Sequence, residues 1–112
     1  MTVVLHARIH GRPGQAEQLA ALLADHVRET TSAPGNLGAV AYAEIGAPDT
    51  FALVMTWADE DAVSAHYESA AYGRYSDAVT ALLAAPSEVE IHHVSQTTRP
   101  VPDLSLDPRR QD

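Results

Sequence analysis

The sequence contains no cysteine and no lysine. Without cysteine, disulfides, thiolate nucleophiles, iron–sulfur clusters and cysteine-ligated zinc sites are excluded. Without lysine, no residue can form a Schiff base, attach pyridoxal phosphate covalently or fill the phosphate-binding position of a P-loop. Several common classes of enzyme are therefore excluded before any motif is considered.

Positive charge is also scarce. The chain has 7 basic residues, all of them arginine, and 15 acidic residues, which gives a net charge of -8. Nucleic acids and anionic membranes are bound by neutralising phosphates, so neither is an expected partner. No apolar run reaches the roughly 18 residues that span a membrane. Met1 leads directly into Val3 and Val4 without the basic segment of a signal peptide, so the expected location is cytoplasmic.

The composition that remains is typical of one compact domain, with 112 residues, 46% hydrophobic and 20% charged. We expect this domain to span residues 1–98. Residues 99–112 contain Pro100, Pro102 and Pro108, and we expect them to be either disordered or packed on a partner subunit.

Hydrophobic periodicity predicts the secondary structure. Alternation with a period of two predicts strands over residues 2–10, 37–45, 50–57 and 88–98, with Phe51, Met55 and Trp57 on one face of the third. Helical spacing predicts a helix over residues 15–31, with His26 on its apolar stripe. A second helical segment begins at residues 59–61, continues past a cap at Ser69 and ends at Pro86.

The predicted order β-α-β-β-α-β indicates an α+β, ferredoxin-like fold, in which an antiparallel sheet carries its helices on one face. The other face would then be bare. Its predicted outward residues are too apolar for water; they are Val4, Val40, Tyr42, Val54 and Val94. A second copy is the simplest cover, so we expect a homodimer.

Several short motifs, and their order along the chain, resemble those of the antibiotic biosynthesis monooxygenase family, the dimeric α+β barrel proteins. The matching segments are 7–9 with 13–14, 33–37, 57–60, and 65–66 with Ser69 and Tyr72. The resemblance covers residues 2–96 and is more specific for the fold than for the reaction.

The resemblance implies a class of activity. Members of the family oxygenate quinols or anthrone-type phenols without metal, flavin or haem, while others degrade haem or isomerise small molecules. It therefore implies a cofactor-independent monooxygenase that acts with O2 on a small aromatic substrate. Haem-degrading members use an asparagine and a histidine ligand where this chain has Ala7 and Ser76, so haem is not expected. Many members also place a glutamate where this chain has Met55.

Oxygenation without a cofactor requires a base with a pKa near neutrality, hydrogen-bond donors and a dry aromatic pocket. We predict His66 as the base or as a donor to the phenol oxygen, with Trp57 against the flat substrate and Tyr72 orienting it. The predicted substrate-binding residues are His26, Tyr75, Phe51, Met55 and Tyr67. Packing in the core is the alternative role for each of these residues.

No metal site is expected, because the sequence has neither HExxH nor a pair of histidines at i, i+4 on a predicted helix, and His92 and His93 point to opposite faces of a strand. Two other functions remain open. One is a non-catalytic small-molecule binding or accessory protein of a biosynthetic pathway; the other is an isomerase or cyclase on the same fold.

Overall fold

The structure is a computed structural model that describes residues 1–100. Its elements are β1 (Thr2–His10), α1 (Ala16–Thr31), β2 (Asn36–Ala43), β3 (Thr50–Trp57), α2 (Glu60–Glu68), α3 (Ala70–Thr80) and β4 (Glu88–Val94). The predicted tail, from residue 101 onward, lies outside the described residues.

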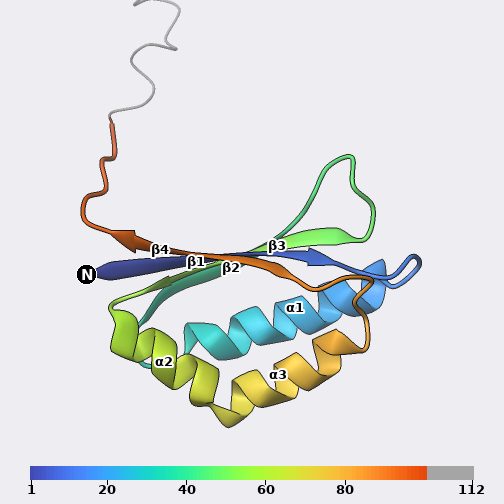
Figure 1. The fold of residues 1–112 in the computed structure, drawn as a ribbon, viewed down its shortest axis with the longest axis horizontal. Coiled ribbons are helices and arrows are strands. Elements are labelled where there is room, and N and C mark those ends of the chain that lie inside the picture. Colours follow the sequence, from blue (N-terminus) through green and yellow to red (C-terminus); the bar gives the residue numbers. More distant parts are fainter. Residues whose placement is uncertain (101–112) are drawn as a thin grey trace, which may run out of the picture.

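The four strands form one antiparallel sheet in the order β2-β3-β1-β4. All three helices lie on one side of it (Figure 1). This confirms the predicted ferredoxin-like α+β fold. Several boundaries differ from the prediction: β2 ends at Ala43 and not at residue 45, α3 ends at Thr80 and not at Pro86, and β4 ends at Val94 and not at residue 98. The second helical segment is divided into α2 and α3 at Ser69, the predicted cap.

The core lies between the sheet and the helices. Val3, Leu5 and Ile9 of β1 are buried, and the register places Leu5 opposite Met55 and Val3 opposite Trp57 on β3. Alternate residues of both strands therefore point toward the helices, as the period of two predicts. Trp57 is the largest of these side chains and is 0% exposed.

Ser69 divides the second helical segment, because its backbone is extended and its side chain caps both helices. The Ser69 hydroxyl donates to the carbonyl oxygen of His66 at 2.6 Å and accepts from the backbone N–H of Tyr72 at 3.1 Å. Asp59 caps the start of α2 by accepting from the N–H of Ala62 at 2.9 Å. No helix within residues 1–100 has the length and apolarity needed to cross a membrane.

The opposite face of the sheet is covered by no helix or strand among residues 1–100 (Figure 1). Val40 and Tyr42 stand on it 45% and 56% exposed. Nearby, the guanidinium of Arg8 donates two hydrogen bonds to the carboxylate of Glu44, at 2.8 and 2.7 Å. Apolar side chains and a charged pair thus share this face, and the predicted dimer remains a prediction.

Gly35 determines how closely α2 approaches the turn after α1. Its φ is +81°, and a Cβ placed on it would lie 2.5 Å from the Cβ of Ala62. Its carbonyl also accepts from the N–H of Ala58 at 2.8 Å. Both the backbone conformation and the contact therefore require glycine at this position.

We predict that Gly35→Ala lowers the free energy of unfolding by about 1–3 kcal/mol more than Gly14→Ala does. Gly14 also has a positive φ, but a Cβ added to it would have no atom within 4 Å, so this variant measures the backbone strain alone. Urea titration of both variants gives the difference. Equal losses, or no partial recovery when Ala62→Gly is added to Gly35→Ala, would contradict the proposed contact.

Candidate functional site

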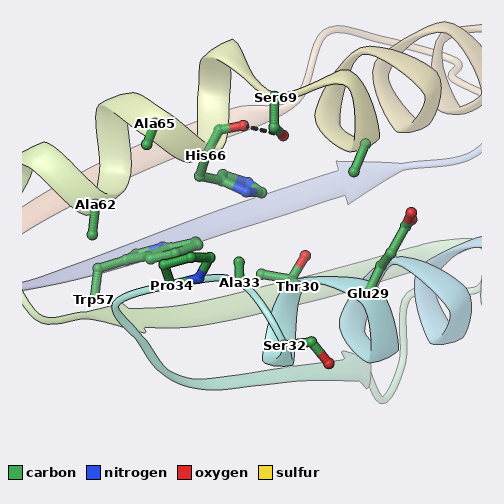
Figure 2. A pocket seen from close by; sticks show the side chains of 11 residues that line it. Glu29, Thr30, Ser32, Ala33, Pro34, Trp57, Ala62, Ala65, His66 and Ser69 are labelled. Atoms are coloured by element: carbon green, nitrogen blue, oxygen red, sulfur yellow. Dashed lines mark hydrogen bonds between the residues drawn. The ribbon is translucent and has the colours of Figure 1, made fainter.

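A cavity of about 270 Å³ opens between the C-terminal end of α1 and the helix α2. Trp57 of β3 and His66 of α2 line it with their rings packed against each other, and Glu29, Thr30 and Ser32 come from the α1 side (Figure 2). The site is therefore built from the end of α1, the end of β3, α2 and the start of α3.

The cavity exists because the side chains around it are small. Ala33, Ala62, Ala65 and Ala71 line it, and none of them reaches into the space. Its volume lies just below the usual range for ligand pockets, about 300–1,000 Å³, so it suits a compact molecule.

The indole of Trp57 forms the wall on the sheet side. Its ring centroid lies 4.8 Å from that of His66, with the rings tilted by 38°. The indole N–H is buried and has no hydrogen-bond partner among residues 1–100. A buried donor without a partner is uncommon, and a ligand that brings an acceptor would satisfy it.

His66 is 7% exposed and lines the cavity with its ring. Burial lowers the pKa of its imidazole below the ordinary value of 6.5, because desolvation disfavours the charged form. The imidazole is therefore neutral at pH 7 and has a nitrogen free to accept a proton.

His26 on α1 lies behind His66, with their ring centroids 5.7 Å apart. Its ring stacks on that of Tyr75 at 3.7 Å and 8°, and neither ring nitrogen has a partner among the described residues. Burial, and secondarily the nearby His66, lowers the pKa of His26 to about 4. Burial likewise raises the pKa of the Tyr75 hydroxyl.

Tyr72 and Tyr67 complete this aromatic cluster. Tyr72 meets the ring of His66 edge-on at 5.2 Å, and its ring lies 4.8 Å from that of Tyr67. Burial raises the pKa of Tyr67, with a smaller contribution from Tyr72. Both tyrosines contact His66 or each other and do not line the cavity itself, so they can act on a ligand there only by holding His66.

Two of the predicted substrate-binding residues lie elsewhere. Met55 is 2% exposed within the core, and Phe51 lines a different groove between α1 and β2. The register explains this, because Phe51 is at the far end of β3 from Trp57 and pairs with Ile9. The structure thus brings together Trp57, His66, His26 and the three tyrosines, and separates Phe51 from them.

The sequence did not indicate the polar side of the cavity. Glu29 pairs with Arg74 at 2.9 Å, which links the end of α1 to α3 beside the cavity. Asn36, at the start of β2, does not line the cavity, and it keeps both polar side-chain atoms buried without a partner among residues 1–100. A polar residue at a helix end or in a turn is ordinary, so only the three-dimensional arrangement reveals these positions.

Within residues 1–100, no three histidine, aspartate or glutamate side chains come together as a metal site requires. His93 lies on the helix side of the sheet, and its Nδ1 lies 3.1 Å from the carboxylate of Glu60 on α2. That pair is largely exposed and lies outside the cavity.

Solved structures share this fold. Rv0793 from Mycobacterium tuberculosis is 23% identical over 88% of this chain and 100% of its own, with a TM-score of 0.81. NE2512, a protein of unknown function from Nitrosomonas europaea, is 25% identical over 89% of this chain and 95% of its own, with a TM-score of 0.75. A protein described as an antibiotic biosynthesis monooxygenase is 19% identical over 86% of this chain and 100% of its own, with a TM-score of 0.77.

No curated protein matches the sequence. A family model does, however, and it aligns with β1 through most of α3, which includes every element that borders the cavity. The chain belongs to the antibiotic biosynthesis monooxygenase family, whose model matches residues 2–78.

Proposed function

We propose that the protein is a cofactor-independent monooxygenase that oxidises a small quinol, anthrone or related phenol with O2. The observation that carries this proposal is the neutral imidazole of His66, packed against the indole of Trp57 where both rings line a compact cavity. A base, an aromatic surface and restricted access to water are what such a reaction needs from a protein.

In the proposed reaction the phenol O–H gives its proton to His66. The resulting phenolate passes one electron to O2, and superoxide and the organic radical then combine into a peroxide anion. This anion takes the proton back from His66 and becomes a hydroperoxide, so the imidazole is neutral again. Loss of water leaves one oxygen atom on the ring carbon, while the second oxygen departs with two hydrogens of the substrate. Substrate plus O2 thus gives oxygenated product plus water, so no external reductant is required.

The remaining residues hold these groups in place. The indole N–H of Trp57, which has no partner among the described residues, can donate to a substrate oxygen. Tyr72 lies edge-on to His66 and limits the rotation of its ring. His26 stays neutral beside His66, because a second positive charge in this buried cluster is unfavourable.

The proposed active form is a homodimer that packs the uncovered faces of two sheets together. Val40 and Tyr42 would be buried in it, and residues 95–100 already extend on that side of the sheet (Figure 1). Sheets pack face to face about 10 Å apart, so the cavities would lie on the outer sides of both sheets.

The direct test supplies metal-free protein with naphthalene-1,4-diol or anthrone and isotopically labelled O2. The expected product gains one labelled oxygen atom, with the second recovered in water. A product of unchanged formula would instead identify an isomerase or cyclase. Tight binding without turnover of any tested phenol would identify an accessory binding protein.

We predict that His66→Ala lowers kcat by about a hundredfold or more, because it removes the proton acceptor. His93→Ala removes an imidazole outside the cavity and should retain wild-type activity. In the wild type, kcat/KM should fall with decreasing pH at a midpoint below 6.5, since burial lowers the pKa of His66. Wild-type rates in His66→Ala would contradict the assigned base.

A separate prediction concerns stability. An unfolded histidine binds a proton near pH 6.5, whereas folded His26 does so only near pH 4. The free energy of unfolding should therefore fall by up to about 3 kcal/mol as the pH drops through that window. His26→Phe keeps the stack on Tyr75 and should show a smaller fall in urea titrations at pH 7, 5.5 and 4. Parallel pH profiles for the two proteins would contradict a buried neutral His26.

The size of the cavity gives a third prediction. Ala65→Leu adds bulk at the mouth of the cavity on an exposed part of α2, so the protein should fold normally. KM for a two-ring substrate should rise about tenfold, equivalent to roughly 1.4 kcal/mol of lost binding. Ser64→Leu adds similar bulk to the same helix away from the cavity and serves as the control. Steady-state oxygen uptake measures both variants, and equal KM values would place the substrate elsewhere.

A further inference from the structure

A second hollow, of about 230 Å³, lies in the crevice between α1 and α3. We call it the α1–α3 hollow. Leu22 of α1 and Tyr75 and Ala78 of α3 form its apolar wall. Glu29 lines both this hollow and the cavity of the candidate site, so the two spaces are neighbours along the same pair of helices.

An ion pair crosses the crevice at the residue that the two spaces share. Arg74 of α3 donates to the carboxylate of Glu29 at 2.9 Å, and Figure 2 shows Glu29 extending from α1 beside the cavity. The side chains of Arg74 and Glu29 are 67% and 50% exposed. Exposed pairs of this kind contribute about 0–1 kcal/mol, so a ligand that enters both spaces can open this pair at little cost.

The imidazole of His26 also lines the α1–α3 hollow. His26 is 3% exposed, and neither ring nitrogen has a hydrogen-bond partner among residues 1–100. Buried polar atoms are normally paired, so an unpartnered imidazole beside a hollow indicates a ligand that brings a polar atom. A neutral imidazole can donate to an ether or carbonyl oxygen and can accept from a hydroxyl group.

The charges around the α1–α3 hollow favour a neutral ligand. Asp25 and Glu29 place two carboxylates beside it, whereas Arg74 supplies the one guanidinium in its lining. Arg28 pairs with Asp25 but does not line the hollow. An anionic group would therefore meet more negative than positive charge. Together with the apolar wall, these charges indicate a neutral aromatic group that carries one polar atom.

We infer that the α1–α3 hollow is a second compartment of the proposed active site and binds a neutral aryl substituent of the phenol that lies beside His66. This inference rests on the proposed function. The substituent displaces the pair of Glu29 and Arg74, and an oxygen atom on it hydrogen-bonds to His26. The two volumes together fall within the usual range for ligand pockets, about 300–1,000 Å³, whereas the first alone does not. The preferred substrate is therefore an aryl-substituted quinol.

Ligands that cannot be oxidised test the second compartment without requiring turnover. Equilibrium dialysis compares 1,4-dimethoxynaphthalene with its 2-(4-methoxyphenyl) and 2-(4-carboxyphenyl) derivatives. The methoxyphenyl derivative should bind the wild type at least about tenfold more tightly than the parent compound, because the hollow buries the added ring. It should also bind more tightly than the carboxyphenyl derivative, which brings a negative charge. Tighter binding of the carboxyphenyl derivative would overturn the neutral substituent.

A variant that fills the α1–α3 hollow locates the added ring. Ala78→Leu adds bulk to the hollow from an exposed position on α3, so the preference for the methoxyphenyl derivative should fall to about twofold or less. Ala21→Leu makes the same substitution at an exposed position on α1 that lines neither space, and it should keep the wild-type preference. An equal preference in the wild type and in Ala78→Leu would overturn the inference.

Two further variants test the ion pair and the imidazole. Arg74→Gln removes the pair, so the preference for the methoxyphenyl derivative should rise about two- to fivefold. An unchanged preference would overturn the pair as the barrier between the compartments. The wild type should bind the methoxyphenyl derivative several-fold more tightly than the phenyl derivative, and His26→Phe should bind the two equally. Equal binding in the wild type would overturn the hydrogen bond to His26.

Binding and turnover together separate this inference from the function on which it rests. A preference that Ala78→Leu abolishes, with no oxygen uptake for any phenol, would contradict the monooxygenase and support the second compartment. Oxygen uptake with naphthalene-1,4-diol, but no preference for the methoxyphenyl ligand, would overturn the second compartment alone. No binding of any of these ligands to the wild type would overturn both.

Discussion

The contact between the indole of Trp57 and the imidazole of His66 is the constraint on which the site depends. Trp57 is completely buried on β3, and His66 packs over it from α2 at 4.8 Å between ring centroids. The rings hold this end of α2 above the sheet, and the alanines beside them leave the space unfilled. A large side chain in contact with a small-residue lining therefore produces a cavity instead of a closed core.

Burial acts on the chemistry through the same contact. Removing His26 and His66 from water lowers the pKa of both imidazoles and keeps them uncharged at neutral pH. A charged cluster would bind water and repel a second cation, whereas a neutral one can accept a proton from a bound phenol. The free energy of burying these polar rings is offset by their packing against Tyr75, Tyr72 and Trp57.

Periodicity predicted the fold because alternation determines which face of a strand is buried. It placed Trp57 and Met55 on the core face, and the helical stripe placed His26 and His66 inward. The cap at Ser69 was also evident, since serine commonly begins a helix. The division into α2 and α3 and the early end of β4 depend on local backbone geometry that periodicity does not specify.

The cavity itself could not be predicted in this way. Periodicity gives the face of a residue but not its neighbour on another element, so Phe51 was grouped with Trp57 although it lies at the opposite end of β3. Ala62 and Ala65 matter because of the side chains they lack, and an alanine on a helix carries no signal of its own. Asn36 and Glu29 likewise gain significance only from the elements that surround them.

The most direct measurement uses the single tryptophan of the chain as a reporter of the cavity. Trp57 fluorescence is followed while the protein is titrated with 1,4-dimethoxynaphthalene, which has the ring system of the proposed substrate but no phenol proton to lose. The proposed site predicts a saturable change in intensity at one ligand per chain, because a ring bound in the cavity would lie next to the indole. A fluorescence signal that stays constant while equilibrium dialysis shows bound ligand would place the binding site elsewhere and contradict the proposal.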